Sequence, residues 1–195
     1  MSSAASPLAS RRLVILDRDG VINEDSDNYI KSLAEWQPIP GSIDAIVRLS
    51  KAGFTIAVAT NQSGINRGLF DLDELEAMHA RFTDLVMDQG GEIAGIFYCP
   101  HTPEENCNCR KPKSGLIDAI ERALCVSAKH VPIIGDTLRD LEAGVKKRCV
   151  PILVKTGKGE RTLQKLRDEP QHPLADVAVF DNLAAAADYL IAHHA

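Results

Sequence analysis

The segment 13–20 has the sequence LVILDRDG, in which a run of apolar residues leads directly into two acids. The run from Leu13 to Leu16 predicts a buried strand that ends at Asp17. Asp19 follows two residues later, and Gly20 lets the chain turn away at once. Because residues i and i+2 of an extended segment point to the same side, we expect both carboxylates to face one ligand.

The same strand pattern recurs along the chain and alternates with helical patterns. Apolar runs predict further strands at 54–59, 93–98, 131–135, 151–154 and 177–180, and stripes at helical spacing predict helices at 43–49, 72–86, 116–124 and 183–192. Asp71 and Ser114 stand where two of these helices begin. Such alternation indicates parallel βαβ units with right-handed crossovers. We therefore expect an α/β fold with a Rossmann-like, doubly wound parallel sheet that has helices on both faces.

The length of 195 residues suits one compact domain, which we expect to span residues 11–195, after a disordered tail at 1–10 that is rich in Ser and Ala. The chain is 25% charged with a formal net charge of -5 and has no long run of either sign, which argues against nucleic acid as a partner. No apolar segment has the length of a secretory signal or a membrane span. We expect a cytoplasmic protein without a membrane partner.

Polar residues follow several of the predicted strands, and ligands of open parallel sheets bind beyond those strand ends. Asp17, Asp19 and Asp136 would converge there and hold magnesium, which favours a few carboxylates with water and phosphate oxygens. The segment 60–64, TNQSG, offers a hydroxyl and backbone N–H groups to a phosphate. Taken alone, the acids also fit a turn with capping carboxylates, and the second segment fits an ordinary polar turn.

Three of the five cysteines lie close together, between residues 99 and 109. Cys99, Cys107 and Cys109, with His101, supply the thiolates and the imidazole of a structural zinc site that has no open position. Unliganded thiols beside a surface histidine are the alternative. Arg110 and Lys111 follow the last cysteine, so a metal-pinned loop would set the direction of both cations.

Four motifs in this order resemble those of the haloacid dehalogenase (HAD) superfamily of phosphotransferases: DRDGV at 17–21, TNQSG at 60–64, Lys111-Pro112, and Gly135-Asp136 with Asp140. The resemblance implies that Asp17 attacks phosphorus to form an aspartyl phosphate and that Asp19 is the general acid and base. It implies that Thr60 and Lys111 hold the phosphoryl oxygens. Magnesium would be held by the Asp17 carboxylate, the Asp19 backbone carbonyl and Asp136. Asp140 would lie next to these ligands without binding the metal directly.

The zinc loop and the sequence CRKP at 109–112 resemble, more narrowly, the bacterial D-glycero-D-manno-heptose-1,7-bisphosphate 7-phosphatases. The resemblance implies removal of the 7-phosphate of this sugar bisphosphate, a step toward activated heptose for lipopolysaccharide or another surface polysaccharide, with the anomer left open. It also implies substrate contacts from Asp25, Ser26, Asp27, Asn28, Tyr29, Asn61, Gln62, Ser63, Arg110 and Thr137. Lys113 is assigned no role.

Two other functions also fit the sequence. The histidinol-phosphate phosphatases share the catalytic residues and the zinc loop. A module that binds a phosphate ligand without catalysis, or a zinc-stabilised interaction module, would have no chemical need for both Asp17 and Asp19. The sequence has no large insertion after either of its first strands, so we expect no large cap domain, an entrance shaped by the zinc loop and residues 23–36, and a monomer.

Overall fold

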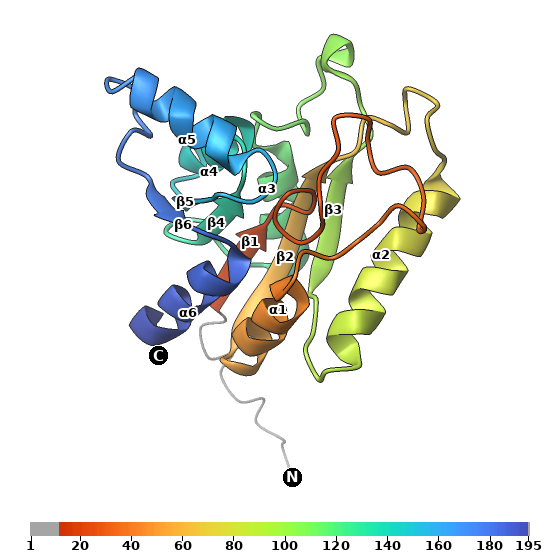
Figure 1. Ribbon diagram of the computed structural model, residues 1–195, viewed down its shortest axis with the longest axis horizontal. Coiled ribbons are helices and arrows are strands. Elements are labelled where there is room, and N and C mark those ends of the chain that lie inside the picture. The colour runs from red at the N-terminus through yellow and green to blue at the C-terminus, as the bar shows by residue number, and fades with distance from the viewer. Residues whose placement is uncertain (1–11, 195) are drawn as a thin grey trace.

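The computed structural model describes residues 12–194, so the tail predicted at 1–10 lies outside the described residues. The described chain contains a six-stranded parallel sheet with the strand order β3-β2-β1-β4-β5-β6 (Figure 1). The predicted α/β fold with a parallel sheet is confirmed. Its strands are β1 (Arg12–Leu16), β2 (Phe54–Asn61), β3 (Gly95–Cys99), β4 (Pro132–Gly135), β5 (Val150–Val154) and β6 (Ala178–Phe180).

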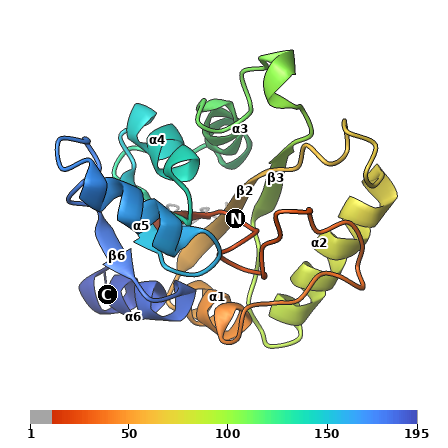
Figure 2. The same ribbon diagram turned by 45° about the horizontal axis from the view of Figure 1, so that its top comes forward.

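Helices cover both faces of this sheet, as predicted. They are α1 (Ser42–Lys51), α2 (Leu72–Met87), α3 (Gly115–Leu124), α4 (Leu138–Lys146), α5 (Gly159–Asp168) and α6 (Leu183–His194), with a short 3-10 helix, η1 (Pro103–Glu105). Val14 and Leu16 of β1 pack into the same core as α1, α2 and α6, whereas Leu13 and Ile15 face α3 and α4. Figure 2 shows α1 and α6 on the opposite side of the sheet from α3 and α4. The continuous apolar run of β1 is thus buried on both faces.

The strand order reverses beside β1. The chain forms β1, β2 and β3 in one direction, then crosses back so that β4 pairs with the other edge of β1. The loops that leave the carboxyl ends of β1 and β4 therefore run to opposite sides of the sheet. Open parallel sheets bind ligands in the crevice between two such loops.

Two helices, α4 and α5, were not predicted. Both are short and polar: α5 buries Gly159, Thr162 and Leu166 and exposes most of its other residues, so no apolar stripe marks it. The predicted helix start at Asp71 is confirmed by a hydrogen bond from Glu74 N–H to the Asp71 side chain. Ser114 also precedes its helix, but its side chain makes no capping hydrogen bond.

The connections that carry the first strand ends are irregular loops. Within the described residues, neither the segment 17–41 after β1 nor the segment 62–71 after β2 contains an inserted domain. The first loop is anchored by the buried side chains of Ile30, Trp36 and Ile39. Among residues 12–194, no helix combines the length and the apolar character needed to span a bilayer.

Helix α2 offers a matched test of how the core is held together. Leu75 is 0% exposed in the core shared with α1, and Leu72 of the same helix is 43% exposed. We expect Leu75→Ala to lower the free energy of unfolding by about 3 kcal/mol, through lost burial and a residual cavity. Leu72→Ala should cost less than about 1 kcal/mol. Denaturant unfolding measures both, and equal losses would contradict this packing.

Candidate active site

A cavity of about 190 Å³ lies at the carboxyl ends of β1, β2 and β4. Four acids line its floor: Asp17 and Asp19 after β1, and Asp136 and Asp140 after β4. Residues that the sequence separates by more than a hundred positions thus meet in one place. The predicted convergence of strand-end residues is borne out by this geometry.

Lys111 supplies the positive charge of this floor. Its side chain is 2% exposed, and Nζ lies 2.9 Å from Asp17 Oδ1 and 2.5 Å from Asp140 Oδ1. Nζ also donates a hydrogen bond to the backbone oxygen of Ala59. Burial opposes the charge, but the carboxylates of Asp140 and Asp17 outweigh it and raise the pKa of Lys111. The lysine is therefore a fixed cation beside Asp17.

Asp17 is held by one oxygen only. Its Oδ1 accepts hydrogen bonds from Arg18 N–H (2.7 Å) and from Lys111, while Oδ2 has no hydrogen-bond partner within the described chain. Burial and the charge of Asp140 raise the pKa of Asp17 to about 7, against the lowering effect of Lys111. A second cation would favour the ionised form.

Asp136 is enclosed by backbone. Its Oδ2 accepts a hydrogen bond from Lys158 N–H (2.8 Å), and a Cβ atom on Gly20 or Gly157 would collide with that oxygen. Only glycine therefore fits at these two positions. Burial and the charges of Asp140 and Asp17 raise the pKa of Asp136 to about 8. This acid, too, lacks a compensating cation.

These acids fit a divalent cation. Carboxylate oxygens of Asp17, Asp136 and Asp140 all lie within 4.8 Å of one another. The Asp140 carboxylate is already occupied, because Oδ1 contacts Lys111 and Oδ2 accepts hydrogen bonds from Thr137 N–H and Oγ1–H. Asp17 and Asp136 therefore have oxygens to offer, and Asp140 is better suited to hold Lys111. A hard cation that accepts few carboxylates, such as Mg²⁺, suits this donor set.

Asp19 differs from its neighbour Asp17 because it carries its own counter-ion. Arg18, which is 1% exposed, donates to both carboxylate oxygens, and Asn23 and Gln62 each donate one further hydrogen bond at 2.8 Å. Burial alone would raise the pKa of Asp19, but Arg18 and the two amides hold it below its usual range. These contacts therefore favour the ionised form of the carboxylate at the floor of the cavity.

Arg18 is fixed from its other side by a residue that the sequence did not indicate. Its Nη1 lies 3.4 Å from Nε2 of His79 on α2. Burial and the positive charge of Arg18 lower the pKa of His79 to about 4. The imidazole is therefore neutral and can accept from the guanidinium. No strand end or motif marks His79, which lies within a predicted helix.

The segment after β2 lines the cavity with side chains that carry hydroxyl and amide groups. Thr60, Gln62 and Ser63 are buried and line the cavity. Asn61 also lines it, but its side-chain amide forms two 3.1 Å hydrogen bonds with the backbone of Lys111. Asn61 thus positions the lysine rather than presenting a free amide to a ligand.

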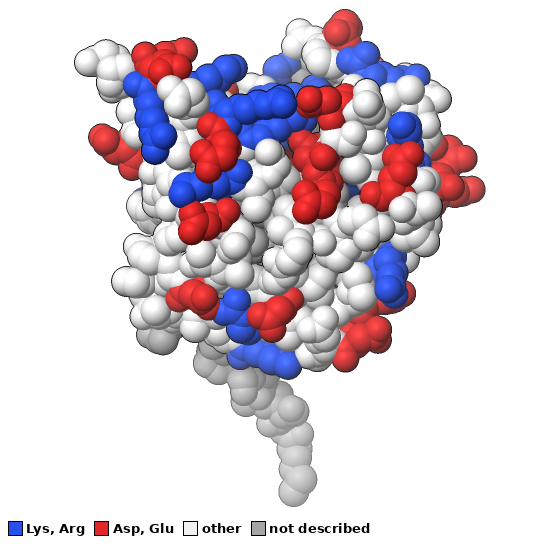
Figure 3. Space-filling view, viewed as in Figure 1, with Lys and Arg blue, Asp and Glu red and all other residues white. Residues whose placement is uncertain are grey.

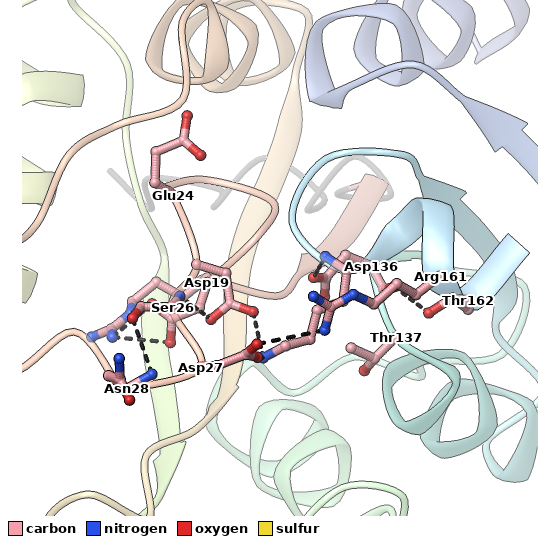
Figure 4. Close-up of polar contacts among 12 residues, drawn as sticks. Asp19, Glu24, Ser26, Asp27, Asn28, Asp136, Thr137, Arg161 and Thr162 are labelled. Atoms are coloured by element: carbon pink, nitrogen blue, oxygen red, sulfur yellow. Dashed lines mark hydrogen bonds and ion pairs between the residues drawn. The ribbon is translucent and has the colours of Figure 1, made fainter.

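The loop 24–29 forms the outer wall. Asp25, Ser26, Asp27 and Tyr29 line the cavity, as does Thr137, whereas the exposed Asn28 does not. Figure 4 shows Asp27 reaching across to Arg161 of α5 on the side of Asp136. Lys158, which no sequence motif indicated, pairs with Asp25 at 2.7 Å and with Asp27 at 3.4 Å. Lys158 lies in the loop after β5. Because ligands of open parallel sheets bind beyond the strand ends, its position after a predicted strand could have indicated it.

The four predicted zinc ligands come together at the end of β3. Sγ of Cys99, Cys107 and Cys109 and Nδ1 of His101 lie within 4.8 Å of one another, with the closest contacts at 3.1 to 3.6 Å. Ligands about 2.3 Å from a tetrahedral ion lie about 3.8 Å apart, so the cluster could hold a metal with little movement. Of the other cysteines, Cys149 is buried and Cys125 is exposed.

Comparison with known proteins identifies similar chains over nearly the whole length. A family model described as HAD-hyrolase-like matches residues 108–186. A curated D-glycero-beta-D-manno-heptose-1,7-bisphosphate 7-phosphatase of Pseudomonas putida is 58% identical over 180 residues, which are 92% of this chain and 99% of the relative. A protein of the same name from Neisseria meningitidis is 48% identical over 94% of this chain and 97% of its own length.

A solved structure agrees with these relatives. The crystal structure of D,D-heptose 1.7-bisphosphate phosphatase from B. bronchiseptica, complexed with magnesium and phosphate, superposes with a TM-score of 0.86 at 45% identity. The match covers 93% of this chain and 99% of that one.

The lowered pKa of His79 predicts a dependence of stability on pH. The unfolded chain takes up a proton on this histidine near pH 6.5, whereas the folded chain does so only near pH 4. Its contribution to stability is thus complete above pH 6.5 and declines as the pH falls toward 4, by at most about 3 kcal/mol. In His79→Gln the free energy of unfolding should fall less steeply over this interval. Identical slopes would show that His79 titrates normally.

The cysteine cluster predicts a metal content. We expect the purified protein to contain about one zinc ion per chain, measured by elemental analysis. The double variant Cys107→Ser/Cys109→Ser should lose that zinc and unfold at a lower temperature, because metal binding stabilises the folded loop. The matched control Cys125→Ser changes an exposed cysteine and should keep both properties. Full zinc content in the double variant would exclude this site.

Proposed function

Because the chain belongs to the family of D-glycero-beta-D-manno-heptose-1,7-bisphosphate 7-phosphatases, we propose that it hydrolyses the 7-phosphate of the β anomer of that sugar bisphosphate. Identity of 58% across nearly the whole of both chains supports this substrate. The observation that carries the proposal is Asp17, which has one oxygen held by Lys111 and the other free to attack phosphorus.

The proposed reaction has two steps that share one phosphoryl position. Asp17 Oδ2 attacks the phosphorus of the 7-phosphate, the bond from phosphorus to the sugar oxygen breaks, and an aspartyl phosphate forms. Water then attacks this acyl phosphate and releases inorganic phosphate together with free Asp17. Lys111, fixed and charged beside Asp17, stabilises the negative charge of both transition states, and Thr60 contributes its hydroxyl.

Asp19 is proposed to move the protons of both steps. It donates one to the sugar oxygen as the bond to phosphorus breaks, and it accepts one from the water that cleaves the intermediate. Its hydrogen bonds with Arg18, Asn23 and Gln62 favour the ionised form, which suits the second step. The negative charge of a bound phosphate acts in the opposite direction and favours the protonated form for the first step.

Both metals are part of the proposal. Asp17, Asp136 and the backbone carbonyl of Asp19 would hold Mg²⁺, which neutralises charge on the phosphoryl group when bound. The magnesium in the B. bronchiseptica structure supports Mg²⁺ as the cation. Zinc held by Cys99, His101, Cys107 and Cys109 would be structural and would fix the loop that carries Arg110 and Lys111.

Recognition of the sugar is assigned to the wall of the cavity. Asp25, Ser26, Asp27, Tyr29 and Thr137 are proposed to contact the heptose, because they line the space next to Asp17. Asn28 is set aside as a contact, since it is exposed and does not line the cavity. The reaction would be a step toward activated heptose for lipopolysaccharide or another surface polysaccharide. A monomeric state and a cytoplasmic location remain predictions.

A substrate panel tests the proposed function. The holoenzyme is assayed with magnesium on both anomers of the heptose bisphosphate and on histidinol phosphate. We expect kcat/KM for the β anomer to exceed that for each of the others by at least about tenfold, since the relatives are named for this anomer. A larger kcat/KM for histidinol phosphate would overturn the proposal and favour a histidinol-phosphate phosphatase.

The control for this panel is Asp17→Asn, which keeps the size of the side chain. Turnover should fall at least about a thousandfold, because an amide cannot form the acyl phosphate. An unchanged circular dichroism spectrum would show that the fold survives. Hydrolysis retained in this variant would exclude Asp17 as the nucleophile, and no turnover of any phosphate ester by the wild type would favour a non-catalytic phosphate-binding module.

A further inference from the structure

Two guanidinium groups at the active-site cavity have no acid partner. Four cations line the cavity, and two of them, Lys111 and Lys158, form the ion pairs described above. The other two are Arg110 and Arg139. Within residues 12–194, no carboxylate oxygen lies within 4.0 Å of either guanidinium. Both guanidiniums therefore carry positive charge that no carboxylate balances at contact distance.

Arg110 is the better fixed of the two. It is half-buried, and its Nη1 donates a 3.0 Å hydrogen bond to the backbone oxygen of His101, so the cysteine loop holds it in place. Burial and the nearby charge of Arg139 lower its pKa, which places the two cations within electrostatic reach of each other. Like charges at close range cost free energy unless an anion lies between them.

Arg139 has no evident structural role. It is exposed at the second position of α4, where the helix dipole disfavours a cation. It also lines two neighbouring hollows, one of about 350 Å³ with Lys158, Arg161 and Lys165, and one of about 390 Å³ with Arg110, Lys113 and Lys146. No acid lines either hollow. Figure 3 shows Lys and Arg side chains on the part of the surface where α5 lies, with acidic side chains among them.

We propose that Arg139 and Arg110 together bind the phosphate group that is not transferred, which makes Arg139 a specificity-determining residue for sugar bisphosphates. The inference rests on the proposed function, in which the 1-phosphate stays on the sugar while the 7-phosphate reacts at Asp17. A phosphate between two guanidiniums accepts charge-assisted hydrogen bonds from both and removes their repulsion. A monophosphate ester leaves both cations unpaired, so it binds less tightly.

The test compares two substrates that differ by one phosphate. kcat/KM is measured with magnesium for the heptose 1,7-bisphosphate and for the heptose 7-phosphate. In Arg139→Gln we expect the value for the bisphosphate to fall about 10- to 100-fold, mainly through KM, with less than about a twofold change for the monophosphate. Arg122→Gln is the matched control, because Arg122 is an exposed arginine of α3 that lines none of these hollows, and it should change neither value.

Each outcome assigns the failure to one of the two proposals. Equal losses of kcat/KM on both esters in Arg139→Gln, or no loss on either, would overturn the phosphate clamp formed by Arg139 and Arg110. Hydrolysis by the wild type would still support the proposed function. A wild type that hydrolyses the monophosphate as efficiently as the bisphosphate would also overturn the clamp alone. A wild type that acts on neither ester would remove the proposed function and the clamp with it. Adding Arg110→Gln to Arg139→Gln should cost less than the sum of the single effects, because both contact one group.

Discussion

The buried ammonium group of Lys111 joins the parts of this molecule that must come together for catalysis. Its partners are the Asp17 carboxylate after β1, the backbone oxygen of Ala59 in β2 and the Asp140 carboxylate in α4. A buried ion is costly unless every one of its partners is in place, and loss of one partner from such a pair costs about 3–5 kcal/mol. The sheet and α4 therefore have to assemble in one arrangement, and that arrangement presents the free oxygen of Asp17 to the cavity.

The short segment that carries Lys111 serves both ends of the cavity. Asn61 binds its backbone from β2, and the cluster of three cysteines and one histidine lies directly before it. Lys111 turns inward to the acids, whereas its neighbour Arg110 is tied to His101 at the rim. The two successive residues thus differ in their electrostatic partners. Lys111 balances carboxylates of the protein, whereas the charge of Arg110 is available to the proposed ligand.

Two carboxylates on the same strand end have different electrostatic surroundings. Asp19 is neutralised by Arg18, which His79 holds from α2, and the pKa of Asp19 is lowered. The pKa values of Asp17 and Asp136 are raised, because burial and mutual repulsion exceed the help from Lys111. Neighbouring acids whose pKa values shift in opposite directions suit the different roles proposed for them, proton transfer for Asp19 and nucleophilic attack for Asp17.

The strands, the strand-end acids and the cysteine cluster could be predicted from the order of residues, because an apolar run, a DRDG turn and closely spaced cysteines are local patterns with a direct physical reading. Helices α4 and α5 could not, because each buries few apolar side chains, and the acceptor role of His79, the ion pairs of Lys158 and the unpaired charge of Arg139 follow no local pattern. These roles depend on which distant groups become neighbours. Coulomb energy and desolvation are set by distance and burial in three dimensions, and separation along the chain carries neither.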